Sequence, residues 1–203
     1  MHRSHETSPN VLQSAGDPVR EAIKTLFDSI KLDPIDRSYR DANGLFFTGA
    51  YGSESIWKKP LGKKVLILDV DTRLPSNENE ILNKEKKVNW EKLSPHGTGG
   101  ISHAITSHYL YALMHGYDYK YIQAVRTPGL HDTWIKPRLI KQMLPDYQFV
   151  ICLDADAVIS HLEIPLEWMF NRWGILEHTS IAMPHDTEEI INGIVFLLYP
   201  TWA

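Results

Sequence analysis

The chain has 203 residues, of which 43% are hydrophobic and 23% are charged, and its formal net charge is -4. This composition is typical of a globular protein with enough apolar material for a core. The charge gives no support for binding to nucleic acid or for a polybasic membrane patch. The single cysteine, Cys152, cannot form an internal disulfide.

Three regions are predicted along the chain. Residues 1–16 are polar and are expected to be disordered. They contain no apolar segment typical of a secretory signal, and no run in the chain approaches the roughly 18 apolar residues of a membrane span. Residues 17–62 are predicted to be a lead-in of helix and loop, and residues 63–203 to be the main domain.

The lead-in begins with a helical pattern. Asp17 suits the N-cap and Pro18 suits the first turn, and apolar residues then recur at helical spacing as far as Ile30. Residues 33–62 are rich in Gly, Pro, Ser and Asp and are predicted to be a loop, with a short apolar cluster at 45–47.

Strand and helix patterns alternate in the main domain. Short apolar runs predict strands at 63–71, 119–125, 149–154, 180–184 and 193–199. Helical patterns are predicted at 101–115, ending at Gly116, within 134–144, and after Pro165. This alternation predicts an α/β fold with a mostly parallel sheet flanked by helices.

Two Asp-x-Asp pairs follow predicted strands. Asp69 and Asp71 end the first strand, and Asp154 and Asp156 end the third. Ligands of open α/β sheets bind beyond the carboxyl ends of the strands. Carboxylates one residue apart can share a Mg²⁺ or Mn²⁺ ion whose other ligands are phosphate and water. Capping of a turn is the competing interpretation, but charges within an apolar run are costly without a partner.

Part of the chain resembles a known family. The block TWIKPRLIKQMLPDYQFVICLDADAVISHLEIPLEWMF is similar to the central block of nucleotide-sugar glycosyltransferases with the GT-A fold, closest to the fungal α-galactosyltransferase and α-mannosyltransferase group. KKVLILDVD resembles the first nucleotide-binding strand of these enzymes, and SHYLYALMHGYDYKYI resembles the helix and turn before their second strand. The similarity extends over about residues 63–186.

This resemblance implies a GT-A, Rossmann-like half that transfers a hexose from a UDP- or GDP-sugar to a glycan or glycoprotein acceptor. It implies Mn²⁺ (or Mg²⁺) held by Asp154 and Asp156, with Asp156 as the favoured direct ligand. The donor-binding residues that it suggests are Asp69, Asp71, Thr72, Lys136 and Asp186. For Lys136 a solvated position in the first helical turn is equally compatible with the sequence. The family resemblance implies the Golgi, with the cytoplasm as the alternative.

The sequence also departs from this family. The chain ends a short distance after Asp156, and His161, His178 and His185 match no late metal-binding motif. No catalytic base or nucleophile can be singled out. We therefore expect that the C-terminal part of the domain and the usual membrane anchor are missing, so that the activity of this chain is an open question.

Two other functions are compatible with the sequence. The run VLILDVDTRL is close to the Asp-x-Asp motif of haloacid-dehalogenase-type phosphatases, in which one Asp is the nucleophile and the next an acid/base. Asp69 and Asp71 would then be the reactive pair, with Lys136 or Lys141 on the phosphoryl group and Asp154 with Asp156 at the metal. The other alternative is an inactive fragment that binds nucleotide sugars.

Aromatic and histidine residues outside these motifs are mostly interpreted as structural. Trp168 and Trp173 lie in a predicted helix and are assigned to the core, whereas Trp57 and Trp90 lie in predicted loops and are the better candidates for ligand contact. His115 lies in the last turn of its helix, where a positive charge suits the helix dipole.

Overall fold

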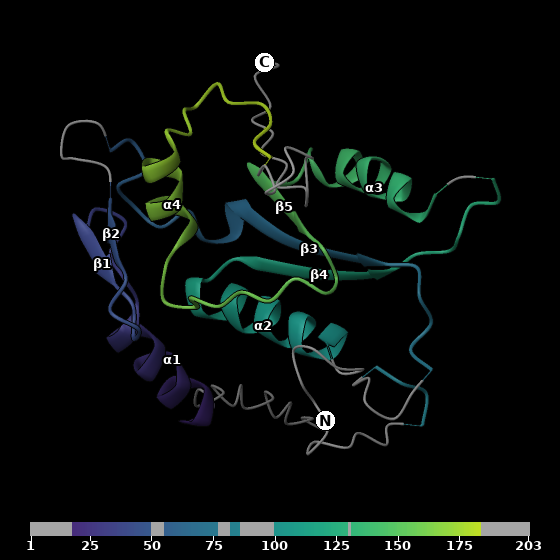
Figure 1. The fold of residues 1–203 in the computed structure, drawn as a ribbon, viewed down its shortest axis with the longest axis horizontal. Helices are drawn as coiled ribbons and strands as arrows, with labels where there is room; N and C mark the ends of the chain where they lie inside the picture. The colour runs from purple at the N-terminus through teal and green to yellow at the C-terminus, as the bar shows by residue number, and fades with distance from the viewer. Residues whose placement is uncertain (1–17, 50–54, 77–81, 86–99, 130, 184–203) are drawn as a thin grey trace, which may run out of the picture.

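The computed structural model describes residues 18–49, 55–76, 82–85, 100–129 and 131–183. These residues form a mixed α/β fold in which a three-stranded parallel sheet is flanked by helices, with a separate two-stranded antiparallel sheet beside it (Figure 1). The predicted fold class is confirmed at this level. Within the described residues, no helix combines the length and hydrophobicity needed to cross a bilayer.

The central sheet has the strand order β4-β3-β5. Strand β3 (Val65–Asp71) pairs in parallel with β4 (Asp118–Gln123) on one side and with β5 (Phe149–Leu153) on the other. Every residue of β3 is buried because it is the middle strand and both of its faces are covered. The three predicted strands at these positions are therefore confirmed.

Helices cover both faces of this sheet. Helix α2 (Gly100–His115) and helix α3 (Ile135–Met143) lie on opposite sides of it, as Figure 1 shows. Side chains of β3 alternate between the two faces, as expected for a period of two. Val65 and Ile67 belong to the core cluster shared with α2, and Leu66, Leu68 and Val70 to the cluster shared with α3.

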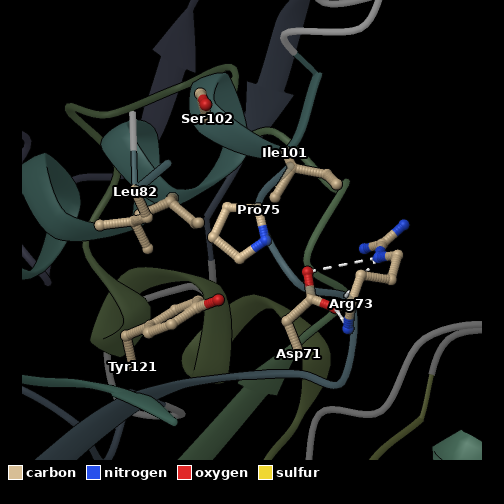
Figure 2. Close-up of a pocket in the computed structure, with 8 residues that line it drawn as sticks. Asp71, Arg73, Pro75, Leu82, Ile101, Ser102 and Tyr121 are labelled. Carbon is tan, nitrogen blue, oxygen red and sulfur yellow. Dashed lines mark hydrogen bonds and ion pairs between the residues drawn. The ribbon is translucent and has the colours of Figure 1, made fainter. Parts of the chain in front are cut away.

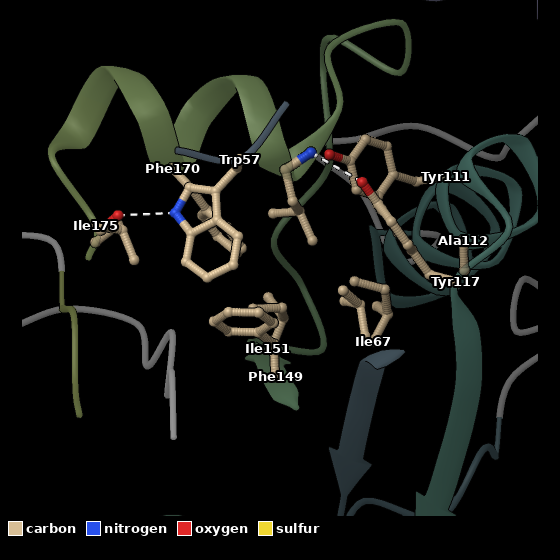
Figure 3. Packing of buried hydrophobic residues seen from close by; sticks show 11 residues of the cluster. Trp57, Ile67, Tyr111, Ala112, Tyr117, Phe149, Ile151, Phe170 and Ile175 are labelled. Atoms are coloured by element: carbon tan, nitrogen blue, oxygen red, sulfur yellow. Dashed lines mark hydrogen bonds between the residues drawn. The ribbon is translucent and has the colours of Figure 1, made fainter. Parts of the chain in front are cut away.

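The core cluster that contains Val65 and Ile67 also includes residues of helix α4 (Leu166–Trp173) and Trp57 (Figure 3). Trp57 is only 7% exposed, packs edge-on against Phe149, and donates a hydrogen bond from Nε1 to the Ile175 carbonyl at 2.7 Å. The interpretation of Trp57 as a ligand contact is therefore wrong. Trp168 is buried as predicted, but Trp173 is 54% exposed, and Trp90 lies outside the described residues.

Residues predicted to be a loop include a hairpin. Strands β1 (Ser38–Arg40) and β2 (Phe46–Thr48) pair in antiparallel fashion. The turn between them is closed by Asp41, whose Oδ1 accepts from the backbone of residues 43 and 45, and by Gly44 at a φ of 83°. The Asn-Gly dipeptide at residues 43–44 is a hairpin signal that the prediction of a loop did not use.

The remaining elements lie near the ends of the sheet strands and in the lead-in. Helix α1 (Pro18–Ile30) forms as predicted, and single-turn 3₁₀ helices occur at η2 (Gly62–Lys64) and η4 (Asp132–Trp134). The predicted strand at 180–184 does not form over its described part, where only Ala182 makes an isolated bridge. The predicted strand at 193–199 lies outside the described residues.

Candidate functional site

The topology places one crevice at the carboxyl edge of the sheet. From β3 the chain crosses by α2 to β4, and from β4 it crosses back by α3 to β5 on the other side of β3. The direction of the crossover thus reverses between β3 and β5. Open α/β sheets bind their ligands outside the strand ends at such a point.

An open cleft of about 470 Å³ lies there, within the usual size range of ligand sites. Its walls come from the ends of β3 and β5, the segment after β4, and the first turns of η4 and α3. The residues that line it are Val70, Asp71, Thr72, Arg73, Arg126, Asp132, Thr133, Ile135, Lys136, Asp154, Ala155 and Asp156. Both Asp-x-Asp segments and Lys136, distant in sequence, therefore meet at one cleft.

The segment after β5 brings its two carboxylates to the cleft in different environments. Asp154 forms an ion pair with Nζ of Lys136, whose side chain is buried. The Asp154 carbonyl accepts from the Ala157 amide at 2.9 Å, which makes a turn, and Ala155 is buried beneath it. Asp156 is 67% exposed. The turn anchors the backbone here, and Asp156 remains accessible to a ligand.

The segment after β3 is held by Asp71 and Gln123. Oδ1 of Asp71 accepts from the backbone N of Arg73 at 2.8 Å and from its Nε at 3.0 Å, the pair that Figure 2 shows. Gln123 at the end of β4 donates from Nε2 to the carbonyls of both Asp71 and Arg73, each at 3.0 Å. These bonds fix the position of Arg73 and Thr72 at the edge of the cleft.

A second, much smaller cavity lies on the α2 side of Asp71, between Tyr121 and Ile101 (Figure 2). Its volume is about 10 Å³, which is room for about one water molecule. This cavity is too small for a nucleotide or a sugar, so the candidate ligand site at this edge is the cleft of about 470 Å³.

Asp69 does not line the cleft. Its side chain is completely buried on the α2 face, where Nδ1 of His108 lies 2.7 Å from Oδ1 and the Tyr119 hydroxyl donates to Oδ2 at 2.6 Å. Burial, together with the hydrogen bond to Asp69, raises the pKa of Tyr119 above its usual value. Asp69 is therefore separated from the cleft that Asp71, Thr72 and Lys136 line.

His115 is structural, but for a reason other than the predicted charge. It is buried, and its Nε2 donates to the Leu162 carbonyl at 2.7 Å. Burial lowers the pKa of His115 to about 4, although the hydrogen bond to Leu162 acts in the other direction. The ring is therefore neutral at pH 7 and contributes no charge to the helix dipole.

The predicted metal ligands Asp154 and Asp156 both line the cleft. No group of three or more His, Cys, Asp or Glu side chains in the described part of the chain could hold an ion. Asp154 and Asp156 offer two carboxylates, and Mg²⁺ is commonly bound by one or two carboxylates with substrate phosphates and water. Asp186, the remaining predicted donor residue, lies outside the described residues.

Three basic or acidic side chains of the cleft were missed by sequence reasoning: Arg73, Arg126 and Asp132. Arg126 pairs with Asp132, with Nε to Oδ2 at 3.1 Å. The rule that predicted the aspartates would also have found both arginines, because each lies within three residues of the carboxyl end of a sheet strand.

The fold and site together define an α/β protein with a charged, ligand-sized cleft at the switch point of its parallel sheet. Comparisons with protein-family models, with curated proteins and with solved structures found no match.

Proposed function

We propose that this cleft binds the diphosphate of a UDP- or GDP-sugar together with Mn²⁺ or Mg²⁺, and that the chain is the donor-binding part of a GT-A-like hexosyltransferase. The observation that carries the proposal is the convergence of Thr72, Lys136, Asp154 and Asp156 on one cleft at the switch point. The resemblance of the Leu-Asp-Ala-Asp-Ala block to nucleotide-sugar transferases supplies the class of ligand.

In the proposed reaction, the bond between the sugar anomeric carbon and the diphosphate oxygen breaks. A bond to an acceptor hydroxyl of a glycan or glycoprotein forms, and the hydroxyl proton is released. A bound metal ion would act as a Lewis acid toward the leaving diphosphate. Asp154 and Asp156 would hold it, and Lys136 and Arg73 would contribute positive charge to the phosphates.

The three predicted donor-binding residues at the end of β3 therefore have different roles: Asp71 and Thr72 lie at the cleft, whereas Asp69 does not. Asp71 and Thr72 both line the cleft, and Asp71 also holds Arg73 at its edge through hydrogen bonds. Asp69 belongs to the interior and is proposed to support the sheet rather than to contact the donor.

Calorimetric titration tests the binding function. UDP-galactose and GDP-mannose are titrated, each with Mn²⁺, into the wild-type chain and into Asp156→Asn. We expect binding of at least one donor and a loss of about ten-fold in the variant, equivalent to about 1.4 kcal/mol. The matched control is Glu177→Gln, an exposed acid that does not line the cleft.

Two results would contradict the proposal: absence of binding by any nucleotide sugar, or equal binding by wild type and Asp156→Asn. Turnover separates the transferase from the inactive alternative. Release of free sugar or of a transferred product from a bound donor indicates an enzyme, whereas binding without turnover indicates a nucleotide-sugar-binding protein.

A further inference from the structure

Each acidic side chain that lines the cleft faces a basic one. The pairs are Lys136 with Asp154, Arg73 with Asp71 and Asp156, and Arg126 with Asp132. A ligand ion that enters this cleft must therefore compete with an existing partner. A cation competes for the carboxylates, and an anion competes for the ammonium and guanidinium groups.

Lys136 is the basic residue most constrained by its surroundings. Its side chain is buried in the first turn of α3, whereas the side chains of Arg73 and Arg126 are 46% and 66% exposed. Burial weakens the screening by water, so the charge of Lys136 acts on Asp154 more strongly than a surface ion pair would.

This arrangement opposes the binding of a metal ion alone. While the ammonium of Lys136 neutralises Asp154, a divalent cation at Asp154 encounters a like charge beside its ligand. Phosphate oxygens reverse the situation because they attract the same ammonium. Once Lys136 contacts phosphate, Asp154 is available to the metal.

We propose that Lys136 makes metal and diphosphate binding depend on each other: it weakens Mn²⁺ binding to the ligand-free cleft and strengthens diphosphate binding. This inference rests on the proposed function and adds to it a coupling between the two ligands that depends on one residue. The cleft then takes up nucleotide and metal as a unit and discriminates against free metal ions.

Lys136→Met tests the coupling because methionine keeps the length and apolar packing of the lysine stem but removes the charge. Two titrations are compared, Mn²⁺ alone and UDP alone in the presence of EDTA, with GDP as the second nucleotide. We expect Lys136→Met to bind Mn²⁺ about ten-fold more tightly and nucleotide about ten-fold more weakly than wild type. Binding of Mn²⁺ is measured by the loss of the free-ion electron paramagnetic resonance signal.

The opposite changes in Mn²⁺ affinity and nucleotide affinity distinguish this role of Lys136 from a purely structural one. A variant that only disturbs α3 would weaken both ligands, and that result would overturn the inference. Lys141→Met is the matched control, on the same helix but exposed and away from the cleft, and it should change neither titration. Asp154→Asn should give the mirror image, with weaker Mn²⁺ and tighter nucleotide binding.

The outcomes also separate this inference from the proposed function. If wild type binds UDP or GDP with Mn²⁺ but Lys136→Met leaves both single-ligand titrations unchanged, the coupling is wrong and the function stands. If wild type binds no nucleotide under any condition, both fail.

Discussion

Buried polar side chains near the sheet form hydrogen bonds with specific partners. His115 is the clearest case, because its ring packs against the rings of Tyr111 and Tyr117, which also contact each other, and donates to the Leu162 carbonyl. It joins the end of α2 to the segment before α4. Lys31 and Glu163 are the nearby charges, and they act in opposite directions on its pKa. Burial dominates, so the folded chain favours the neutral ring.

This residue predicts an acid-sensitive stability. The unfolded chain binds the proton of a histidine with a pKa near 6.5, and the folded chain only near 4. The contribution is therefore complete above about pH 6.5 and is lost as the pH falls toward 4. Between pH 7 and pH 5, urea unfolding of wild type should lose about 2 kcal/mol more than that of His115→Gln, which retains a donor for Leu162. Equal losses of unfolding free energy in both proteins would show that protonation of His115 does not cause this pH dependence.

At the same scale, the two aspartates of β3 show what the sequence could predict. The apolar run correctly placed both at the carboxyl end of a buried strand. The sequence could not show that Asp69 has its partners, His108 and Tyr119, on other elements. Residues 69 and 71 lie on the same face of the strand, but only Asp71 is at the open edge. Position along the strand therefore decided their different roles.

At the scale of elements, Asn171 docks the segment before β3 on α4. Its Oδ1 accepts from the amides of Ile56 and Trp57 at 3.1 and 3.0 Å, and its Nδ2 donates to the carbonyls of Trp57 and Pro34. This segment has no regular secondary structure, so side-chain bonds satisfy its buried backbone. The sequence pattern of a loop thus gave no sign that Trp57 is part of the core.

Asn171→Ala should therefore lower the free energy of unfolding by about 3 kcal/mol, because it leaves several buried backbone groups without partners. Chemical denaturation followed by tryptophan fluorescence measures the change and also reports on Trp57. Asn43→Ala, at an exposed turn, is the control and should stay within about 0.5 kcal/mol of wild type. A loss in Asn171→Ala as small as that in the control would mean that the docking is not held by this side chain.

The accuracy of the predicted secondary structure depended on the length of each element. The longer strands and helices have clear apolar periods, and they were predicted within a few residues. The hairpin of β1 and β2 was missed because three residues are too short to show alternation, although its turn residues were visible. The strand predicted at 180–184 had the right composition, but its described residues form only one bridge.

At the scale of the whole molecule, ligand binding should be coupled to global stability. The cleft is assembled from segments that follow all three strands of the parallel sheet, so an unfolded chain cannot present it. Mn²⁺ with UDP or GDP at about 100 times the dissociation constant should add about 2.7 kcal/mol of stability.

The corresponding increase in melting temperature is about 5 °C or more for a chain of this size. Differential scanning calorimetry with both ligands, with each alone, and with Asp156→Asn provides the comparison. The increase should be larger with metal and nucleotide together than with either alone, and it should be small in the variant. An equal increase in Asp156→Asn would place the ligand elsewhere.

The sequence predicted the class of the fold, the carboxyl edge as the candidate site, and five of the twelve residues that line the cleft, namely Asp71, Thr72, Lys136, Asp154 and Asp156. It could not predict the pairing of charges across the cleft. Lys136 meets Asp154, and Arg73 lies near Asp156, only because the packing of α3 and the parallel pairing of β3 with β5 bring distant segments together. Such contacts depend on three-dimensional arrangement, which spacing along the chain does not encode.

The two ends of the sheet strands have separate tasks. The amino ends, where Tyr117 bonds to Glu167 and Gln148 to Lys64, contribute nothing to the lining of the cleft. Substitutions that strengthen the contacts at the amino ends of the strands can therefore raise the melting temperature without altering which ligand the protein binds. Substitutions at the carboxyl ends of the strands can change ligand specificity while the contacts at the amino ends continue to stabilise the sheet.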